Sequence, residues 1–314
     1  MRSAIAAFAL LAMPATWSQL MVSARSGMIH HVEGNVTMAG EQVVIPTGSF
    51  PEVNVGQTLE TGAGRAEVLL TPGVFLRMDE NSSFKMISNQ LTDTQVQLVT
   101  GSALVEVDEL LKDNHIAVRV GESETTLLKN GLYHFNADSG QIRVFDGKAE
   151  VSVGSTSVEL TKGRTVILAS AMTVDKFNTK AAKTDGLYAW SLHRAGELSV
   201  ANSYAASQVP NGTYRTSLWA YDPWLNMYTF LPRWGLIDSP FGQVWYSPST
   251  IWINTVQTYV VQTTGVSSGG GNSTTSSGLV TSSAPSASSA ISGGGARSSG
   301  GSAAVPAPSG ARGR

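Results

Sequence analysis

Hydrophobic and polar residues alternate along the first half of the chain. Val96 and Leu98 alternate with Gln95 and Gln97, and Val151 and Val153 are separated by a serine. A period of two places one face of a strand on a core and the other towards water or a second layer. Turn residues separate these runs at intervals of about 8–12 residues, as in a sandwich or roll. The pattern predicts an all-β domain, an antiparallel β-sandwich or roll, over residues 25–173.

Glycine-containing segments give the expected connections. Asp146-Gly147 separates two alternating runs and predicts a β-hairpin with a type I′ turn, because both central positions of that turn need a positive φ. Thr71-Pro72-Gly73-Val74 predicts a type II turn, in which proline fixes φ and glycine supplies the positive value. Gly62-Ala63-Gly64 resembles part of a dinucleotide-binding pattern, but no helix follows it. We therefore expect a turn between strands there.

The period changes from two to that of a helix after the β domain. Between about Thr184 and Ser207, apolar and small residues recur every three or four positions, and Thr184 or Asp185 can cap the first turn. Gly186 and Gly196 each weaken a helix by about 1 kcal/mol. We therefore expect one helix within residues 174–207 that depends on packing against the β domain.

Aromatic residues and prolines dominate the next segment, residues 208–262. Eleven aromatic side chains lie between Trp219 and Tyr259, and prolines recur every eight or nine residues from Pro223 to Pro248. Proline at this density excludes a long helix or a central strand. The segment is predicted to consist of short extended pieces joined by turns.

The two ends of the chain have compositions typical of a leader and a linker. Arg2, an apolar run from Ala4 to Met13 and the small residues Val22-Ser23-Ala24 predict a signal peptide over residues 1–24, with cleavage after Ser18 as the alternative. Residues 263–314 are rich in Ser, Gly, Ala and Thr and contain no acidic residue, so a disordered tail is expected. The predicted localisation is periplasmic or secreted.

Composition excludes several classes of function. The chain has no cysteine, which excludes disulfides, thiolate metal sites and a lipid-anchored N-terminal cysteine. Without the predicted leader and tail, 17 basic and 23 acidic residues remain. This mildly acidic balance argues against nucleic acid as a partner. No second apolar run approaches the ~20 residues of a membrane span, so we expect no span after signal cleavage.

No catalytic, cofactor-binding or metal-binding motif stands out, and a non-enzymatic protein is expected. His30 and His31 are adjacent in a predicted strand, so their side chains should point to opposite faces and cannot chelate one metal. Glu106, Asp108 and Glu109 lie where a strand ends and are interpreted as a solvated turn. An enzyme whose catalytic residues assemble only in space is the remaining alternative.

The aromatic segment is the candidate binding surface. Exposed indole and phenol rings form flat platforms for sugar faces and anchors for protein partners. Because so many exposed rings would form an intolerably large apolar patch, we expect most to be buried against the β domain and a few to be exposed. The candidate contact residues are Trp219, Trp224, Trp234, Trp245, Trp252, Tyr221 and Tyr246.

Several strand-and-glycine motifs in the β domain resemble the FecR domain. They are the runs from Val55 to Gly62, Gly101 to Val107, Gly131 to Phe135 and Gly147 to Val151, and the resemblance extends from about Val32 to Ala169. It implies an all-β domain found in the periplasm and supplies no catalytic residues.

The best known FecR proteins pass a siderophore-uptake signal from an outer-membrane receptor to a cytoplasmic sigma factor. They have a cytoplasmic segment and a membrane helix before the β domain, whereas only Met1-Arg2-Ser3 precedes the apolar run here. We therefore expect an exported FecR-like protein that binds an envelope protein or polysaccharide. A carbohydrate-binding module using the aromatic segment is the alternative, and a periplasmic signalling component is the third hypothesis.

Overall fold

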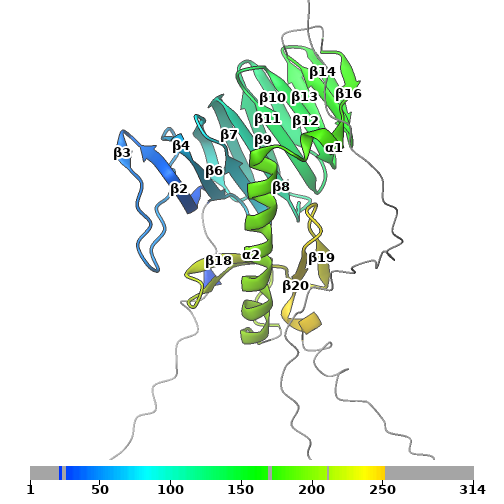
Figure 1. The fold of residues 1–314 in the computed structure, drawn as a ribbon. Coiled ribbons are helices and arrows are strands. Elements are labelled where there is room, and N and C mark those ends of the chain that lie inside the picture. The colour runs from blue at the N-terminus through cyan, green and yellow to red at the C-terminus, as the bar shows by residue number, and fades with distance from the viewer. Residues whose placement is uncertain (1–20, 23–25, 169–171, 211, 252–314) are drawn as a thin grey trace, which may run out of the picture. The chain divides into compact units, whose positions relative to one another are not determined.

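The computed structural model describes residues 21–22, 26–168, 172–210 and 212–251 (Figure 1). The chain divides into two compact units, residues 1–262 and 263–314, and every described residue belongs to the first. The predicted tail, most of the predicted signal segment and Trp252 therefore lie outside the described residues.

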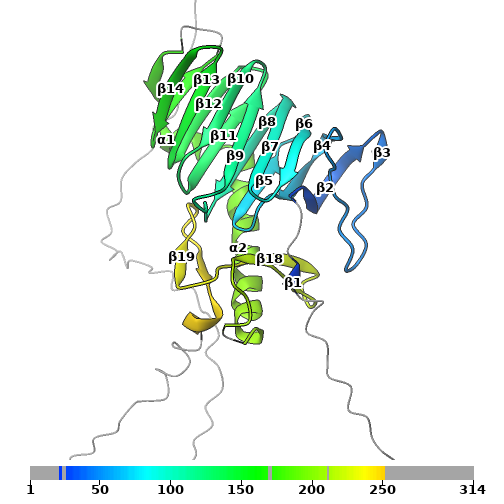
Figure 2. The ribbon, with the colours of Figure 1, turned by 180° about the vertical axis from the view of Figure 1, so that it is seen from behind.

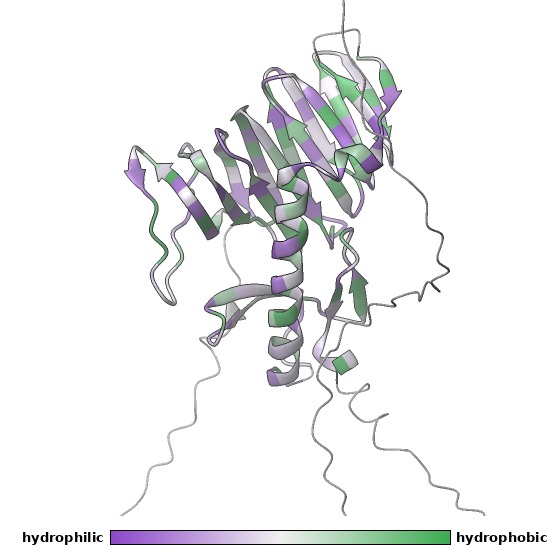
Figure 3. Ribbon diagram, viewed as in Figure 1, coloured by the Kyte–Doolittle hydropathy of each residue, from purple (hydrophilic) through white to green (hydrophobic). Residues whose placement is uncertain are grey.

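One large β-sheet forms the main body, as the alternating pattern predicts. Its strands are β2 (Met28–Met38), β3 (Glu41–Gln42), β4 (Thr58–Leu69), β5 (Val74–Met78), β6 (Ser83–Gln90), β7 (Asp93–Thr100), β8 (Ser102–Val107), β9 (His115–Val120), β10 (Ser123–Leu127), β11 (Gly131–Asn136), β12 (Gln141–Asp146), β13 (Lys148–Val153), β14 (Thr156–Thr161), β15 (Arg164–Ile167) and β16 (Val174–Lys176). The hydropathy colouring alternates along many of these strands (Figure 3). β16 extends the sheet three residues into the segment expected to be helical.

The sheet rolls around a single core. Its strand order is β14-β13-β10-β9-β7-β6-β4-β5-β8-β11-β12-β15-β16, with β2 paired to β4 and to β3. All pairs are antiparallel except β7 with β9. β14, at one end of this order, lies beside β12 and β15, near the other end. The enclosed side chains form one apolar cluster, and the prediction of an antiparallel roll is confirmed.

Strand β4 carries the chain from one layer of the roll to the other. Its first residues, Thr58–Glu60, pair with β6, whereas Ala66–Leu69 pair with β5. Between these two stretches β2 and β4 approach so closely that a Cβ at Gly34 would lie 2.3 Å from the carbonyl oxygen of Ala63. Gly62-Ala63-Gly64 thus lies inside β4 rather than in a turn, and only glycine fits the close approach.

The two predicted glycine turns have different outcomes. The N–H of Val74 donates to the carbonyl of Thr71 at 2.8 Å and Gly73 has a φ of +84°, so a glycine-dependent β-turn joins β4 to β5 as predicted. The prediction of a β-hairpin at Asp146-Gly147 is wrong. β12 pairs with β11 and β15, and β13 pairs with β10 and β14, so Gly147, with a φ of +95°, turns a corner between the layers.

The helices α1 (Thr179–Ala182) and α2 (Gly186–Gln208) follow the sheet. The short α1 is capped by Asn178, and α2 is capped by Asp185, whose carboxylate accepts from the N–H of Leu187 at 2.9 Å. The predicted helix, its extent and one of its two predicted caps are confirmed. Both views show α2 running from the main sheet to the strands that follow (Figures 1 and 2).

The aromatic segment forms short strands, which agrees with the extended pieces predicted for it. They are β17 (Leu218–Asp222), β18 (Met227–Leu231), β19 (Leu236–Asp238) and β20 (Val244–Tyr246), and β17 and β18 form a small sheet with β1 (Met21–Val22). Apolar side chains of β17, β18 and β20 pack with Leu198 of α2 against Met28, Leu69 and Phe75 of the main sheet. The aromatic segment and α2 therefore cover part of the sheet's outer face.

Candidate functional site

Three adjacent strands place charged side chains on the covered outer face of the sheet. Their inward neighbours, such as Ala66, Leu76 and Val105, belong to the core, so the alternation directs Glu67 of β4, Arg77 of β5 and Glu106 of β8 outwards. All three side chains are fully buried, because α2 and the aromatic segment lie over them.

Arg77 joins the two carboxylates. Its Nε donates to Glu67 Oε2 at 2.8 Å and its Nη1 donates to Glu106 Oε2 at 2.6 Å. The guanidinium also lies over the rings of Phe75 and Phe241, with its central carbon 5.2 and 5.7 Å from the ring centroids. A planar cation with several donors suits this buried position between carboxylates and aromatic rings.

Glu67 has two further partners, one on α2 and one on β2. Arg194 of α2 donates through Nη2 to Glu67 Oε1 at 2.8 Å, and His30 Nδ1 lies 2.9 Å from the same oxygen. Burial raises the pKa of a carboxyl, but the guanidiniums of Arg194 and Arg77 outweigh burial and hold the pKa of Glu67 well below its usual range.

His30 is a neutral part of this network. The N–H of Tyr228 donates to His30 Nε2 at 2.8 Å, so the ring proton is on Nδ1 and is donated to Glu67. Burial lowers the pKa of His30, and the nearby Arg194 lowers it further. His30 therefore links the sheet to β18 without adding a buried charge.

Glu106 and Asp108 do not form the expected solvated turn, because both are fully buried. The hydroxyl of Ser239 donates to Glu106 Oε1. Burial, followed by the charge of Glu106, raises the pKa of Asp108 well above its usual range. The interpretation failed because it considered only neighbours in sequence, whereas Arg77 and Ser239 lie 29 and 133 residues away from Glu106 along the chain.

These groups form what we call the buried ion network: His30, Glu67, Arg77, Glu106, Asp108, Arg194 and Ser239. It contains three carboxyl groups and two guanidiniums, so a proton on Asp108 makes it neutral. Its members come from the sheet, α2 and the aromatic segment. All but Asp108 are joined by hydrogen bonds or ion pairs, whereas the carboxyl oxygens of Asp108 are buried without a hydrogen-bond partner among the described residues. The network therefore fixes how the three parts are packed together.

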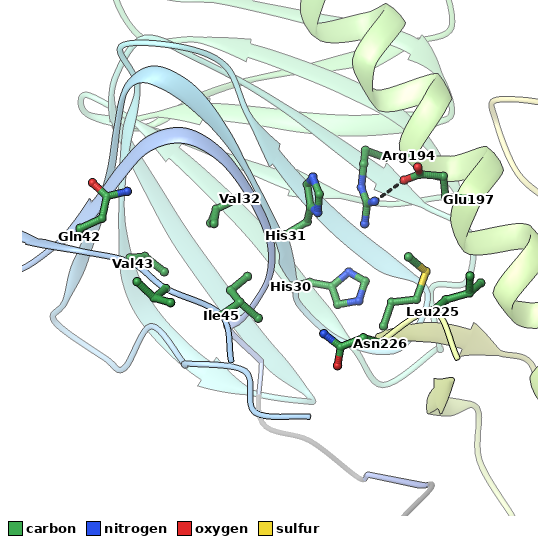
Figure 4. A pocket seen from close by; sticks show the side chains of 12 residues that line it. His30, His31, Val32, Gln42, Val43, Ile45, Arg194, Glu197, Leu225 and Asn226 are labelled. Carbon is green, nitrogen blue, oxygen red and sulfur yellow. Dashed lines mark hydrogen bonds and ion pairs between the residues drawn. The ribbon is translucent and has the colours of Figure 1, made fainter. Parts of the chain in front are cut away.

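A cavity of about 580 Å³ lies next to the network (Figure 4). His30, His31, Arg194 and Glu197 contribute to its wall, together with residues 42–45 and the turn between β17 and β18. Both histidines line it, contrary to the expectation of opposite faces, because a β-bulge in β2 between Ile29 and His31 changes their orientation. The charged groups of the wall are paired, Arg194 with Glu197 and His31 with Glu33.

The aromatic residues predicted to form a binding surface divide into buried and exposed groups. Trp219 and Trp245 are fully buried and pack in edge-on and stacked contacts with Phe75. Their inclusion among the contact residues was wrong, because strands β17 and β20 direct both rings towards the main sheet. Tyr221 and Tyr246 are partly buried.

Among the tryptophans that the structure describes, two have exposed indole rings. Trp224, in the turn between β17 and β18, has 80% of its surface exposed, and Trp234 has 61%. Trp224 is nevertheless held in place, because its Nε1 donates to the hydroxyl of Tyr204 on α2 at 2.8 Å. Beside it lies an apolar pocket of about 240 Å³ between α2 and β17, lined by Tyr204, Ala205, Gln208, Val209, Ala220, Tyr221 and Pro223.

The described residues carry neither a metal-binding cluster nor a membrane-spanning helix. Within these ranges, no group of three or more His, Asp or Glu side chains is arranged to hold a metal ion. None of the helices in the described ranges is both long enough and apolar enough to cross a membrane.

Comparisons with known proteins agree with the resemblance of the β domain. The family described as "FecR protein" matches residues 57–164, which include Glu67, Arg77 and Glu106 but neither His30 nor Arg194. No match was found among curated proteins.

Two crystal structures of a proposed anti-sigma factor from Parabacteroides distasonis ATCC 8503 are similar to this chain. They are 16% and 17% identical to it, cover 41% and 43% of it, and have TM-scores of 0.35 and 0.36. The chain spans 64% of each of those proteins, which is less than two thirds of their length. Scores this low carry no argument about function. The assignment rests instead on the family match, which places a FecR domain at residues 57–164 of the chain.

Proposed function

We propose that this FecR-domain protein is exported and acts without catalysis, by binding a protein of the cell envelope through the exposed aromatic surface around Trp224. This Trp224 surface consists of Tyr204, Tyr221, Pro223, Trp224 and Leu225. Export is proposed from the sequence of residues 1–24, which has the layout of a secretory signal.

The observation that carries the proposal is the Trp224 ring, which is exposed but fixed. A freely moving ring would lose side-chain entropy on binding, whereas the hydrogen bond to Tyr204 already restricts this one. The adjacent apolar pocket can accept a partner's side chain, and aromatic anchors beside such pockets carry much of the energy of protein interfaces.

The charged groups of the molecule support a binding role rather than a reaction. Four of the most deeply buried ionisable groups, Glu67, Arg77, Glu106 and Arg194, bond to one another, so their charges already have partners. A catalytic acid or base must instead reach a substrate proton.

The test is capture of envelope proteins by the full exported chain, with Trp224→Ala compared with wild type. We expect the variant to retain its melting temperature and to lose captured protein by about tenfold or more, since a central aromatic anchor contributes roughly 2 kcal/mol or more. Val200→Ala is the matched control, because Val200 is 63% exposed on α2 and lies outside the Trp224 surface.

Equal capture by wild type and Trp224→Ala would contradict the proposal. A glycan array with the same proteins tests the carbohydrate alternative. Binding to a polysaccharide that depends on Trp224, without protein capture, would assign the surface to sugar recognition.

A further inference from the structure

One edge of β17 is paired only with the N-terminal segment. β18 pairs with all five residues of β17, from Leu218 to Asp222. On the other edge, within the described ranges, β1 pairs with Trp219 and Ala220 alone, through Val22 and Met21. The pairing is antiparallel, so this edge accepts the main chain of an extended strand.

The strand that occupies this edge lies within the predicted signal peptide. Met21 and Val22 precede the predicted cleavage site after Ala24. Cleavage there would remove β1 and leave the Trp219–Ala220 edge of β17 without its partner. A strand edge exposes N–H and C=O groups that readily pair with another chain.

The vacated edge would adjoin the surface already proposed to bind a partner. Ala220 and Tyr221 belong to β17 and also line the apolar pocket of about 240 Å³, together with residues of α2. Trp224 lies two residues beyond the end of the strand and is 80% exposed. In strand addition, main-chain hydrogen bonds give affinity and pockets for alternate side chains give specificity.

We infer that signal cleavage opens the edge of β17 and that an extended apolar segment of a partner protein pairs there, antiparallel to β17, with a side chain in the adjacent pocket. The inference rests on the export included in the proposed function and adds to it the conformation of the bound partner segment.

The first measurement is the intact mass of the protein recovered from the producing cell. A mature chain that begins at Arg25 lacks β1 and supports the inference. A chain that begins at Gln19, after the alternative cleavage site, retains Met21 and Val22 and would overturn it. A full-length mass in the cytosol would contradict export itself, and with it the proposed function.

The second measurement uses a synthetic peptide of residues 17–24 and the mature full-length chain. We expect saturable one-to-one binding, a raised melting temperature, and about tenfold weaker binding for one of the two peptides with proline at residue 21 or residue 22. Successive N–H groups of a strand point to opposite edges, so only one of these two residues donates to β17. Equal binding of the proline peptides, or no binding at millimolar concentration, would overturn the inference. So would a dimer that the peptide dissociates, because a second copy would then be the occupant.

The two proposals can fail separately. If the peptide binds but Trp224→Ala leaves envelope capture unchanged, the edge is a strand-binding site and the Trp224 surface is not the partner site. If capture depends on Trp224 but the peptide does not bind, the surface stands and strand addition is wrong.

Discussion

At the scale of single residues, Glu67 shows how a charge is stabilised away from water. A buried carboxylate is costly unless its partners are well placed, and Glu67 accepts from Arg77, Arg194 and His30. Each partner comes from a different element of secondary structure. Loss of this one charge therefore leaves two buried guanidiniums with less compensation.

Glu67→Gln is predicted to lower the free energy of unfolding by about 3–5 kcal/mol, the cost typical of breaking a buried ion pair. Glutamine has nearly the same shape as glutamate, but only one of its two terminal atoms is an oxygen that can accept. Its N–H₂ group would therefore face one of the donors that Glu67 now accepts from. Urea unfolding measures the change.

Glu197→Gln is the matched control. Glu197 also bonds to Arg194, but its side chain is 40% exposed, so the expected loss is about 0–1 kcal/mol. Similar losses for the two variants would contradict the role given to burial.

The sequence could not reveal the ion network. Glu67 and Glu106 alternate with core residues, but water is the ordinary environment of the opposite face, and the prediction for Glu106 was a solvated turn. Their partner Arg77 is 29 residues from Glu106, and Arg194 is 127 residues from Glu67. The sequence does contain one sign that the outer face is covered. Phe75, Leu104 and Leu132 are apolar residues at outward positions of neighbouring strands, as expected when both faces of a sheet are buried.

At the scale of elements, the corner at Gly147 joins the two layers of the roll. The hydroxyl of Tyr133 donates to the carbonyl of Lys129 at 2.5 Å and accepts from the N–H of Lys148 at 3.1 Å, and it fills the space beside Gly147. A Cβ on Gly147 would lie 2.3 Å from this oxygen. Both the space and the φ of +95° require glycine.

Gly147→Ala is predicted to lower the free energy of unfolding by about 1–3 kcal/mol, because the new methyl displaces Tyr133 and a positive φ is strained for alanine. Gly154→Ala provides the comparison. Gly154 has a φ of +58° and no atom within 4 Å of an added Cβ, so only the backbone cost of roughly 1 kcal/mol applies. Chemical denaturation of both variants gives the difference, and equal losses would show that Tyr133 moves freely.

Local sequence chemistry predicted some of these elements well and others poorly. The cap at Asp185 and the turn at Gly73 depend on residues within four positions of one another, and both are present. The Asp146-Gly147 prediction failed because a glycine with positive φ also suits a corner. The strands on either side of Gly147 do not pair with each other: β12 pairs with β11, and β13 pairs with β10. The residues of the turn itself do not reveal these partners.

At the scale of the whole molecule, buried titratable groups make stability depend on pH. Burial, followed by the charge of Arg143, lowers the pKa of His134 from 6.5 to about 4. The unfolded chain therefore binds a proton that the folded chain refuses, and stability is lost as pH falls from about 6.5 to 4. Asp108 acts in the opposite direction, because its raised pKa favours the folded state as pH falls.

Comparing wild type with His134→Gln isolates one of these contributions. The difference between their free energies of unfolding is predicted to change by about 2 kcal/mol between pH 7 and pH 5, in the direction of a relatively more stable variant at pH 5. Urea titrations at the two values measure it. A difference that does not vary with pH would mean that His134 keeps its ordinary pKa in the folded protein.

The bond between the N–H of Tyr228 and His30 joins residues 198 positions apart, which has a consequence for the order of folding. Contacts of such separation form late, because closing a long loop is entropically costly. Until α2 and β18 are in place, Glu67, Arg77 and Glu106 must face water on an uncovered sheet. We expect these charges to keep neighbouring nascent chains from associating through that sheet, so the groups that the finished protein buries protect the unfinished one from aggregation.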